Sequence, residues 1–465
     1  MSVRAAVAGG EMSESGGVAD SHVIAHSAAK RERRQFITHN AMAAGGTWVA
    51  GILGLLLQAV VSHHFRPGEY GGVFAVFSFF TVLTQPAAGF SRMIAWTTSR
   101  ELATTHGTDV ESSALLRLTI RRLTLIGSAI GLVFVVAALP LAHYLDVPVW
   151  YVVLGALGVP FLFATSPMLA SLQGEQRWVP WSALSIGIAL SRVVFVVIFI
   201  WFFGKTLGPA GVLLGISVAS AVLYFTALAM VWPRMRRGRA PSQWRPLWRF
   251  LVVSVTSTVT VSVLMGSDVI IVQHFFAGKQ AGQFSAVTVT ARALFFAMGS
   301  VTSVLFPKVA ARHARQRGTR SVVFASVGIA LIGGLLGLLV FSLLSTTILH
   351  DFSGKSYEGG ATYIGWYALG MPLLAAVVML SNTQQSLADL NLLWVLIPAT
   401  LIKPLLIYFF HESLLIVSLM SDVSIAAVLV ALAVQYLITE RRAPPGPGPD
   451  VGLDGINGSI AAAPG

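Results

Sequence analysis

The chain has 465 residues, of which 55% are hydrophobic and 11% are charged, and its mean hydropathy is +0.76. A soluble domain carries about 25% charged residues, so this composition excludes an ordinary soluble protein and indicates a membrane protein. The sequence contains no cysteine, which excludes disulfides, thiol chemistry and cysteine metal ligands.

Twelve apolar segments follow one another along the chain, and each is long enough to cross roughly 30 Å of hydrocarbon. A chain in lipid must satisfy its own backbone hydrogen bonds, so continuous apolar segments predict helices rather than barrel strands. We therefore expect an all-α polytopic membrane protein with about 12 transmembrane helices. The predicted spans are residues 41–63, 71–96, 119–143, 149–172, 180–203, 208–232, 250–273, 282–306, 321–349, 360–384, 391–411 and 413–438.

The Lys and Arg residues predict how these helices are oriented. The two tails and the even-numbered connections hold 23 of the 31 Lys and Arg residues, whereas the odd-numbered connections hold only Arg66, Lys205, Lys279 and Lys355. Positive charge marks the cytoplasmic side, so both termini are expected in the cytoplasm of a multi-pass protein of the cell (cytoplasmic or inner) membrane. The net charge of +12 is then a topology signal that also attracts anionic membrane lipids, and no nucleic-acid partner is expected.

An internal repeat indicates two similar halves. HHFRPGEYGGVFAVFSFF matches HFFAGKQAGQFSAVTVTAR at an offset of 210 residues, which aligns His64 with His274 and Gly68 with Gly278. Each half contains six spans, an even number, so the halves should be parallel repeats that form two six-helix lobes around a central cleft. The expected parts are a disordered cytoplasmic tail at 1–35, a first lobe at 36–232, a basic cytoplasmic linker at 233–249, a second lobe at 250–438 and a second disordered tail at 439–465.

Four cationic side chains are the clear cases of charge within predicted spans. They are Arg92, Arg192, Arg292 and Lys403. A central Arg or Lys costs about 2.5–3.5 kcal/mol on insertion scales, so these groups must face an interior, a partner or water. Polar residues share their helix faces at helical spacing, as a hydrated cavity requires. We interpret the four cations as candidate substrate-binding residues, together with Gln85, Ser285 and Thr288.

The acids inside the spans are fewer, and they are Asp268 and Asp422. Two acids cannot neutralise four cations, so a shared cavity would remain positive and would suit a phosphate or diphosphate. Asp268 or Asp422 could instead carry a coupling proton or sodium ion, or form a structural ion pair with a neighbouring cation. We find no catalytic constellation, metal-ligand spacing or phosphate loop, which predicts a transporter rather than an enzyme, with no cofactor except a coupling H⁺ or Na⁺.

Two hairpins carry a family resemblance. FRPGEYGGVFAVFSFFTVLTQPAAGFSRMIAW resembles the first hairpin of the Wzx-type polysaccharide flippases, which belong to the MATE-like multidrug/oligosaccharidyl-lipid/polysaccharide exporter superfamily. GSDVIIVQHFFAGKQAGQFSAVTVTARALFF, followed by VLFPKVA, resembles their helix 7–8 hairpin, with an Asp in helix 7 and a Phe-Pro at the end of helix 8. By matching region, the resemblance carries over Arg92, Arg292 and Asp268. The first span lacks the arginines expected of a lipid II flippase.

The resemblance implies a two-lobed transporter that rocks between inward-open and outward-open states. Its expected cargo is a lipid-linked anionic glycan, such as a polyprenyl-diphosphate saccharide, which is flipped to the outer leaflet for cell-surface polysaccharide synthesis. Polysaccharide-assembly proteins are its expected partners, and it should act as a monomer. Three alternatives remain open: a MATE-type drug/cation antiporter, a membrane polysaccharide polymerase or glycosyltransferase, and an envelope scaffold.

Overall fold

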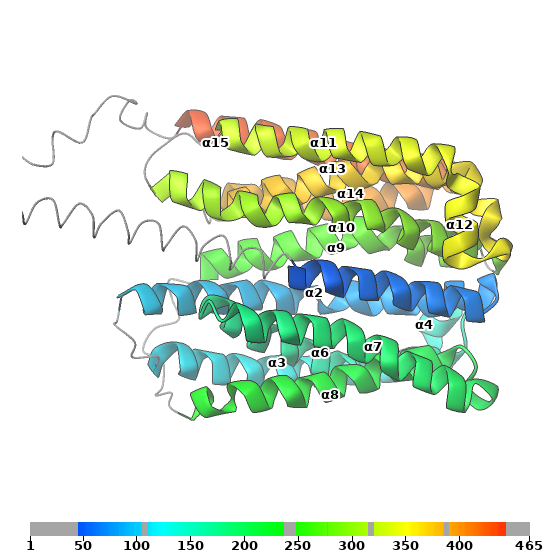
Figure 1. Cartoon of the computed structure of the whole chain (residues 1–465), viewed down its shortest axis with the longest axis horizontal. Coiled ribbons are helices and arrows are strands. Elements are labelled where there is room, and N and C mark those ends of the chain that lie inside the picture. Colours follow the sequence, from blue (N-terminus) through cyan, green and yellow to red (C-terminus); the bar gives the residue numbers. More distant parts are fainter. Residues whose placement is uncertain are drawn as a thin grey trace, which may run out of the picture.

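The computed structural model is a bundle of long helices that lie side by side (Figure 1). It describes residues 45–104, 110–236, 248–276, 278–314, 320–385 and 390–442. The regular elements in these ranges are helices, without strands, and each predicted span coincides with a helix or a broken helix. The all-α prediction is therefore confirmed. The tail at 1–35, and most of the linker and of the second tail, lie outside the described residues.

The helices fall into two consecutive sets. Those of the first lobe are Gly45–His64, α2 (Pro67–Thr104), α3 (Val110–Val136), α4 (Ala138–Tyr144), α5 (Val149–Ala156), α6 (Val159–Gly174), α7 (Trp178–Leu207) and α8 (Ala210–Met235). Those of the second lobe are α9 (Trp248–Phe275), α10 (Lys279–Ala314), α11 (Arg320–Leu343), α12 (Ser345–Ser353), η2 (Lys355–Gly360), α13 (Ala361–Gln385), η3 (Leu390–Leu392), α14 (Leu393–Phe409) and α15 (Leu414–Arg442).

Within the described ranges, ten helices are long and apolar enough to cross a membrane, or eleven if the bent pair α11–α12 counts as one span. The helix α10 corresponds to the remaining predicted span but is more polar. Its Gln283, Ser285, Thr288 and Thr290 are buried inside the protein. Because these polar side chains face protein rather than lipid, α10 can lie within the bundle despite its polarity.

The predicted span at 321–349 is not one straight helix. The chain bends by 83° after α11, and α12 then runs in a new direction. The first half has a similar break, because α3 ends at Val136 and the short α4 follows. The sequence of α12, STTILHDFS, is amphipathic, and its Leu349 is buried. An amphipathic segment suits a position across the end of the bundle (Figure 1) better than a continuation through lipid.

The two repeat copies meet at one end of the bundle, which we call the hairpin end. It holds the turn between His64 and Pro67 and the turn between Phe275 and Lys279. A Cβ on Gly68 would lie 3.2 Å from the Cα of Gly278, its equivalent in the second copy. Contact between equivalent residues is what two repeats related by an axis between them produce.

Glycine is needed at the hairpin end for two reasons. Gly278 has a φ of +71°, a conformation that side chains disfavour. A Cβ on Gly282 would lie 1.7 Å from the carbonyl oxygen of Pro67, so the α2 and α10 backbones touch directly. On α2, Pro67 occupies the first helical position, and the Glu69 carboxylate accepts a hydrogen bond from the backbone N–H of Arg66 (3.0 Å).

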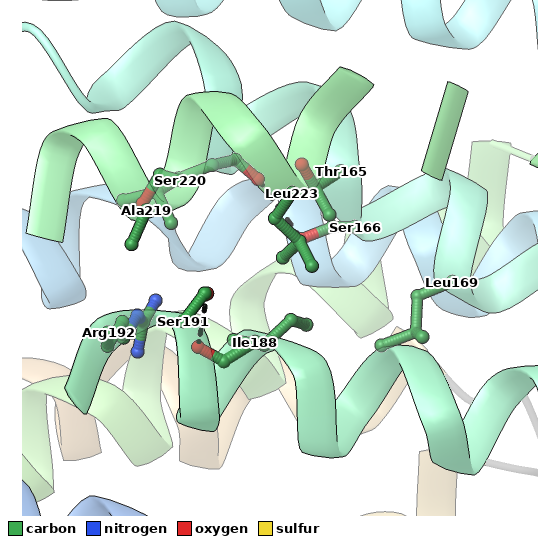
Figure 2. Close-up of a pocket in the computed structure, with 10 residues that line it drawn as sticks. Thr165, Ser166, Leu169, Ile188, Ser191, Arg192, Ala219, Ser220 and Leu223 are labelled. Carbon is green, nitrogen blue, oxygen red and sulfur yellow. Dashed lines mark hydrogen bonds between the residues drawn. The ribbon is translucent and has the colours of Figure 1, made fainter. Parts of the chain in front are cut away.

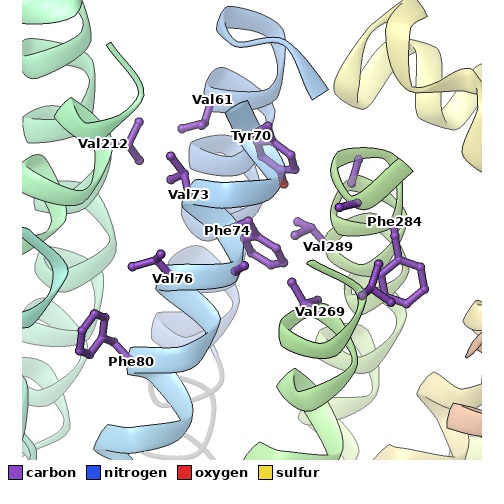
Figure 3. Packing of buried hydrophobic residues seen from close by; sticks show 14 of the residues in the cluster. Val61, Tyr70, Val73, Phe74, Val76, Phe80, Val212, Val269, Phe284 and Val289 are labelled. Carbon is purple, nitrogen blue, oxygen red and sulfur yellow. The ribbon is translucent and has the colours of Figure 1, made fainter. Parts of the chain in front are cut away.

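Buried apolar side chains join the lobes more tightly at the hairpin end than at the opposite end. One cluster runs through both lobes in the hairpin half, and Figure 3 shows Phe74 of α2 facing Val269 and Val289 of the second lobe. In the opposite half, the cluster around Leu380 lies within the second lobe, and the cluster around Met93 lies in the first lobe with Phe250 and Leu251 of α9 packed against it. The lobes are therefore closed together at the hairpin end.

Candidate functional site

The second lobe contains a fully buried ion pair. Lys403 on α14 and Asp268 on α9 are both 0% exposed, and Lys403 Nζ lies 2.8 Å from Asp268 Oδ2. Lys403 also donates to the carbonyl oxygen of Leu264. Asp268 Oδ2 accepts a second hydrogen bond, from the Tyr367 hydroxyl (2.7 Å), and Asp268 Oδ1 accepts one from the backbone N–H of Val269 (2.9 Å). Because both charges are matched and hydrogen-bonded, the pair can exist without water.

Arg292 of α10 lies at the seam between the lobes. It donates to the carbonyl oxygen of Met265 in α9, and its guanidinium carbon lies 5.6 Å from the ring centre of Phe74 in the first lobe. Its Nε atom is buried and has no hydrogen-bond partner among the described residues. An aromatic face attracts a cation but does not neutralise it, so Arg292 retains an uncompensated positive charge between the lobes.

Asp422 of α15 is a second buried acid of the second lobe. It is 7% exposed, and neither carboxyl oxygen has a hydrogen-bond partner among the described residues. The carboxyl packs against Gly370 of α13, where a Cβ would lie 2.3 Å from Asp422 Oδ1. It interacts electrostatically with Lys403. A buried carboxyl is costly without a nearby cation, and Lys403 is the cation that acts on it.

The substitution Gly370→Ala should displace the Asp422 side chain. The added methyl group needs the space that the carboxyl occupies, and overpacking of this kind costs about 1–3 kcal/mol. We expect a lower thermal unfolding midpoint for the purified protein. Gly187→Ala is the matched control, because Gly187 lies inside α7 with nothing within 4 Å of an added Cβ. Equal midpoints for the two variants would contradict the expected clash.

Arg92 joins the lobes toward the opposite end. From α2 it donates hydrogen bonds to the side-chain carbonyls of Asn382 (3.2 Å) and Gln385 on α13. Both partners are neutral amides, so the positive charge of Arg92 is hydrogen-bonded but not balanced. Gln85, which precedes Arg92 on the same helix, donates to the carbonyl oxygen of Thr81 in that helix (3.4 Å).

Arg192 lies in a different place, where it lines a partly open cavity of the first lobe. The cavity has a volume of about 130 Å³ and is formed by α6, α7 and α8. Figure 2 shows the Arg192 nitrogens between the helix that carries Ser191 and the helix that carries Ala219 and Ser220. A second, smaller cavity of about 10 Å³ lies between the first helix, α2 and α8, beside Gln58.

The structure thus distributes the predicted residues over several places. Lys403 and Asp268 form a pair, Arg292 and Arg92 lie at the seam, and Arg192 lines a cavity of its own. Ser285 and Thr288 are buried on α10, on the same helix as Arg292. Their contact with a substrate, and ion coupling by Asp268 and Asp422, remain predictions. No group of three or more metal-ligating side chains is found in the described ranges.

The sequence interpretation did not single out two contributors to these contacts. Tyr367 donates to Asp268, and Asn382 accepts from Arg92. A signal for Tyr367 was present, because Tyr363, Tyr367 and Gly370 recur at helical spacing within an apolar span. Asn382 precedes Gln385 by one helical turn at the end of the same span, so the pair could also have been recognised as a polar stripe.

Solved structures share the helical fold of this chain. A structure described as the inward-facing conformation of a multidrug resistance MATE family transporter of the MOP superfamily has a TM-score of 0.64 at 14% identity, over 88% of this chain and 96% of that chain. A structure of the MATE multidrug transporter DinF-BH, solved as a complex, has a TM-score of 0.66 at 16% identity, over 87% and 95%. This chain has the MATE fold. At such identity the likeness establishes the fold, which in these transporters comprises twelve helices in two lobes.

A third similar structure is described by the polarity of its binding pocket. It is a MOP superfamily transporter from Pyrococcus furiosus, for which a reverse polarity of the binding pocket is described as suggesting a different function. Its TM-score is 0.60 at 13% identity, over 87% of this chain and 95% of that chain. No protein-family model matches the present chain, and no curated protein matches it. The cargo of this chain must therefore be inferred from the charged residues inside it.

Proposed function

We propose that this protein is an alternating-access exporter that moves an anionic, polyprenyl-diphosphate-linked saccharide from the inner to the outer leaflet of the cell membrane. The MATE fold supports a transporter in which two lobes move against each other. The closed hairpin end, where one apolar cluster runs through both lobes, suits a state that receives cargo at the opposite end. With both termini in the cytoplasm, as the distribution of Lys and Arg predicts, that end faces the inner leaflet.

The observation that carries this proposal is a set of arginines without acidic partners. Asp268 is the acid paired with a spanning cation among the described residues, and its partner is Lys403. Arg92 contacts amides, Arg292 contacts a carbonyl and an aromatic ring, and Arg192 lines a cavity. An unpaired cation at membrane depth is costly, and an anionic cargo would compensate it. Phosphates suit arginine because they accept two parallel hydrogen bonds.

Asp422 favours a second candidate function. A MATE-type drug/cation antiporter needs an acid that binds a cation or a proton, and Asp422 is a buried carboxyl with unpartnered oxygens. The two functions assign different roles to this residue. In the flippase, Asp422 would carry a coupling proton or sodium ion. In the antiporter, the cationic cargo and the coupling ion would compete for the Asp422 carboxylate. We propose no catalytic role, which separates both candidates from a polymerase or a glycosyltransferase.

Reconstituted transport distinguishes the two candidates. Proteoliposomes would be loaded with a fluorescent polyprenyl-diphosphate disaccharide, and its exposure would be followed by quenching with an impermeant reductant. A parallel set would be tested for proton-driven uptake of a cationic rhodamine dye. We expect the saccharide lipid to be flipped and the dye to be left unmoved. The reverse result would establish the antiporter, and movement of neither would reject both functions.

The variant Arg292→Ala tests the role of the charge at the seam. We expect normal insertion and at least about a tenfold loss in the flipping rate, because one charge-assisted hydrogen bond is worth about 1.5–3 kcal/mol. Arg121→Ala is the control, since Arg121 is an exposed arginine of α3. If Arg292→Ala flips the lipid as fast as Arg121→Ala does, Arg292 does not bind the cargo.

A further inference from the structure

The Arg192 cavity is built differently from the contacts at the seam. Four hydroxyl side chains line it, namely Thr165, Ser166, Ser191 and Ser220, and the remaining lining is apolar apart from Arg192. No carboxylate is among the lining residues. The described residues also provide no hydrogen-bond or ion-pair partner for Arg192 itself. A guanidinium carries five N–H donors and no acceptor. Among the described residues, no acceptor pairs with these donors and no carboxylate balances the positive charge.

The hydroxyl groups are held by the backbone and still present oxygen lone pairs to the cavity. Thr165, Ser191 and Ser220 donate to carbonyls of their own helices at 2.7, 3.0 and 2.8 Å. Ser166 makes only a long hydrogen bond of 3.4 Å, to Leu162, so its hydroxyl is the one most easily turned toward a ligand. The cavity therefore combines one strong cationic donor with hydroxyls that can adjust, a combination suited to an oxyanion.

The size of the cavity limits what it can hold. Drug-sized ligands occupy pockets of about 300–1,000 Å³, and this cavity of about 130 Å³ is too small for them. It is nevertheless about ten times larger than the roughly 10–15 Å³ that one water molecule requires. A compact group such as a phosphate fits these limits, whereas a saccharide or a planar aromatic cation does not.

The depth of the cavity identifies the source of such a phosphate. Arg192 lies at the middle of the 30-residue α7, which places it about 21 Å along the helix from either end. The hydrocarbon layer is roughly 30 Å thick, so its midplane lies about 15 Å from the headgroups. The phosphate of a resting bilayer lipid does not reach that depth. A phosphate at Arg192 must therefore belong to a headgroup that is crossing the membrane.

We propose that the cavity formed by α6, α7 and α8 binds a phosphate of the transported lipid at mid-membrane depth, with Arg192 as its principal ligand. This inference rests on the proposed flippase function and adds a separate site to it. The saccharide then stays outside the cavity, and the first lobe holds the lipid phosphate. Arg292, at the seam, contacts the cargo from the other lobe.

Binding to the purified full-length protein tests this site directly. The probes are farnesyl diphosphate, farnesol, inorganic pyrophosphate and phosphatidylglycerol, and the readout is the ligand-dependent rise of the thermal unfolding midpoint. We expect stabilisation by farnesyl diphosphate and none by farnesol. Arg192→Gln should weaken farnesyl diphosphate binding by about tenfold or more, because a charge-assisted hydrogen bond is lost. Arg192→Lys should recover part of the affinity, since it restores the charge but not the two-pronged geometry.

Two further variants keep the test decisive. Arg177→Gln removes the same charge just before α7, where Arg177 is exposed and lies 3.6 Å from Glu175, and it should bind the probe normally. Ala219→Val retains Arg192 but fills part of the cavity, so it should weaken binding even if Arg192→Gln fails to fold. Equal affinity in Arg192→Gln, Ala219→Val and the unmodified protein would overturn the site.

The probes also separate the sources of the phosphate. Arginine-dependent binding of phosphatidylglycerol alone would assign the cavity to bilayer lipid and overturn the link with a transported cargo. Inorganic pyrophosphate should bind more weakly than farnesyl diphosphate, because it lacks the apolar tail. Flipping by the unmodified protein together with unimpaired binding by Arg192→Gln would reject this site and leave the proposed function standing. Arginine-dependent binding without any flipping would reject the proposed function and leave the phosphate site standing.

Discussion

Replacing Lys403 with methionine is expected to reduce the yield of folded protein severely. The substitution leaves Asp268 at 0% exposure without its cation, and breaking a buried ion pair from one side costs about 3–5 kcal/mol. That is a large share of a typical folding stability of about 5–15 kcal/mol. The measurement is the yield of monodisperse protein after detergent extraction, followed by its thermal unfolding midpoint.

The partner variants show whether the loss comes from the stranded charge. Asp268→Leu alone should also destabilise, because it leaves the Lys403 ammonium buried without its partner. The double variant Asp268→Leu with Lys403→Met removes both charges, and such replacements are often neutral or stabilising by about 1–4 kcal/mol. We therefore expect the double variant to be more stable than either single one, with a coupling energy that a double-mutant cycle measures. Additive losses would show that the two charges do not act as a pair.

The double variant also separates structure from coupling. If it folds and still flips the lipid, the pair serves only to hold α9 against α14. If it folds and does not flip, the charges of Asp268 and Lys403 are needed in the transport cycle. Tyr367→Phe removes one further hydrogen bond to Asp268 and keeps the ring, so it provides a milder probe of the same network.

A side chain at Gly282 is expected to force the lobes apart at the hairpin end. A Cβ there would lie 1.7 Å from the carbonyl oxygen of Pro67, and backbone atoms cannot give way as a flexible side chain does. Gly282→Ala should therefore shift the population toward states that are open at this end and reduce transport. Gly54→Ala is the control, since Gly54 has nothing within 4 Å of an added Cβ.

Distances between the two hairpin tips measure this effect. The chain has no cysteine, so spin labels on Arg66→Cys and Lys279→Cys, which replace two exposed residues, would be the only labels. We expect a longer and broader distance distribution in Gly282→Ala than in the Gly54→Ala control. An unchanged distribution would show that the α2–α10 contact does not hold the hairpin end closed.

Reciprocal contacts between the lobes explain why this closure should act as one unit. From the first lobe, Tyr144 stacks on His274 with ring centres 4.1 Å apart, and its carbonyl accepts a hydrogen bond from His274 Nδ1 (2.7 Å). From the second lobe, the hydroxyl of Tyr357 donates to the carbonyl oxygen of Phe65 (3.0 Å). Each lobe thus holds the hairpin tip of the other. The closed end follows from the repeat, because matching elements reach across the same axis.

Much of the architecture could be read from the sequence, because the features concerned are local. Hydropathy over some 20 residues is enough to place a span, and it placed those that became α2, α7 and α13. The repeat offset that aligned Gly68 with Gly278 located the hairpin end before any contact was known. The break between α11 and α12 was missed, because an 83° bend depends on what the polar residues of α12 meet at the end of the bundle.

The sequence by itself determined that charged groups lie inside the membrane and that they must be shielded from lipid. It identified Arg92, Arg192, Arg292, Lys403 and Asp268 by their depth in apolar spans, and it suggested one shared positive cavity. Only the tertiary structure decided their partners, placing Lys403 on Asp268 and leaving Arg192 alone in a cavity of the first lobe. The physical reason is that depth follows from position along a helix, whereas partnership depends on the rotation and packing of helices far apart in the chain.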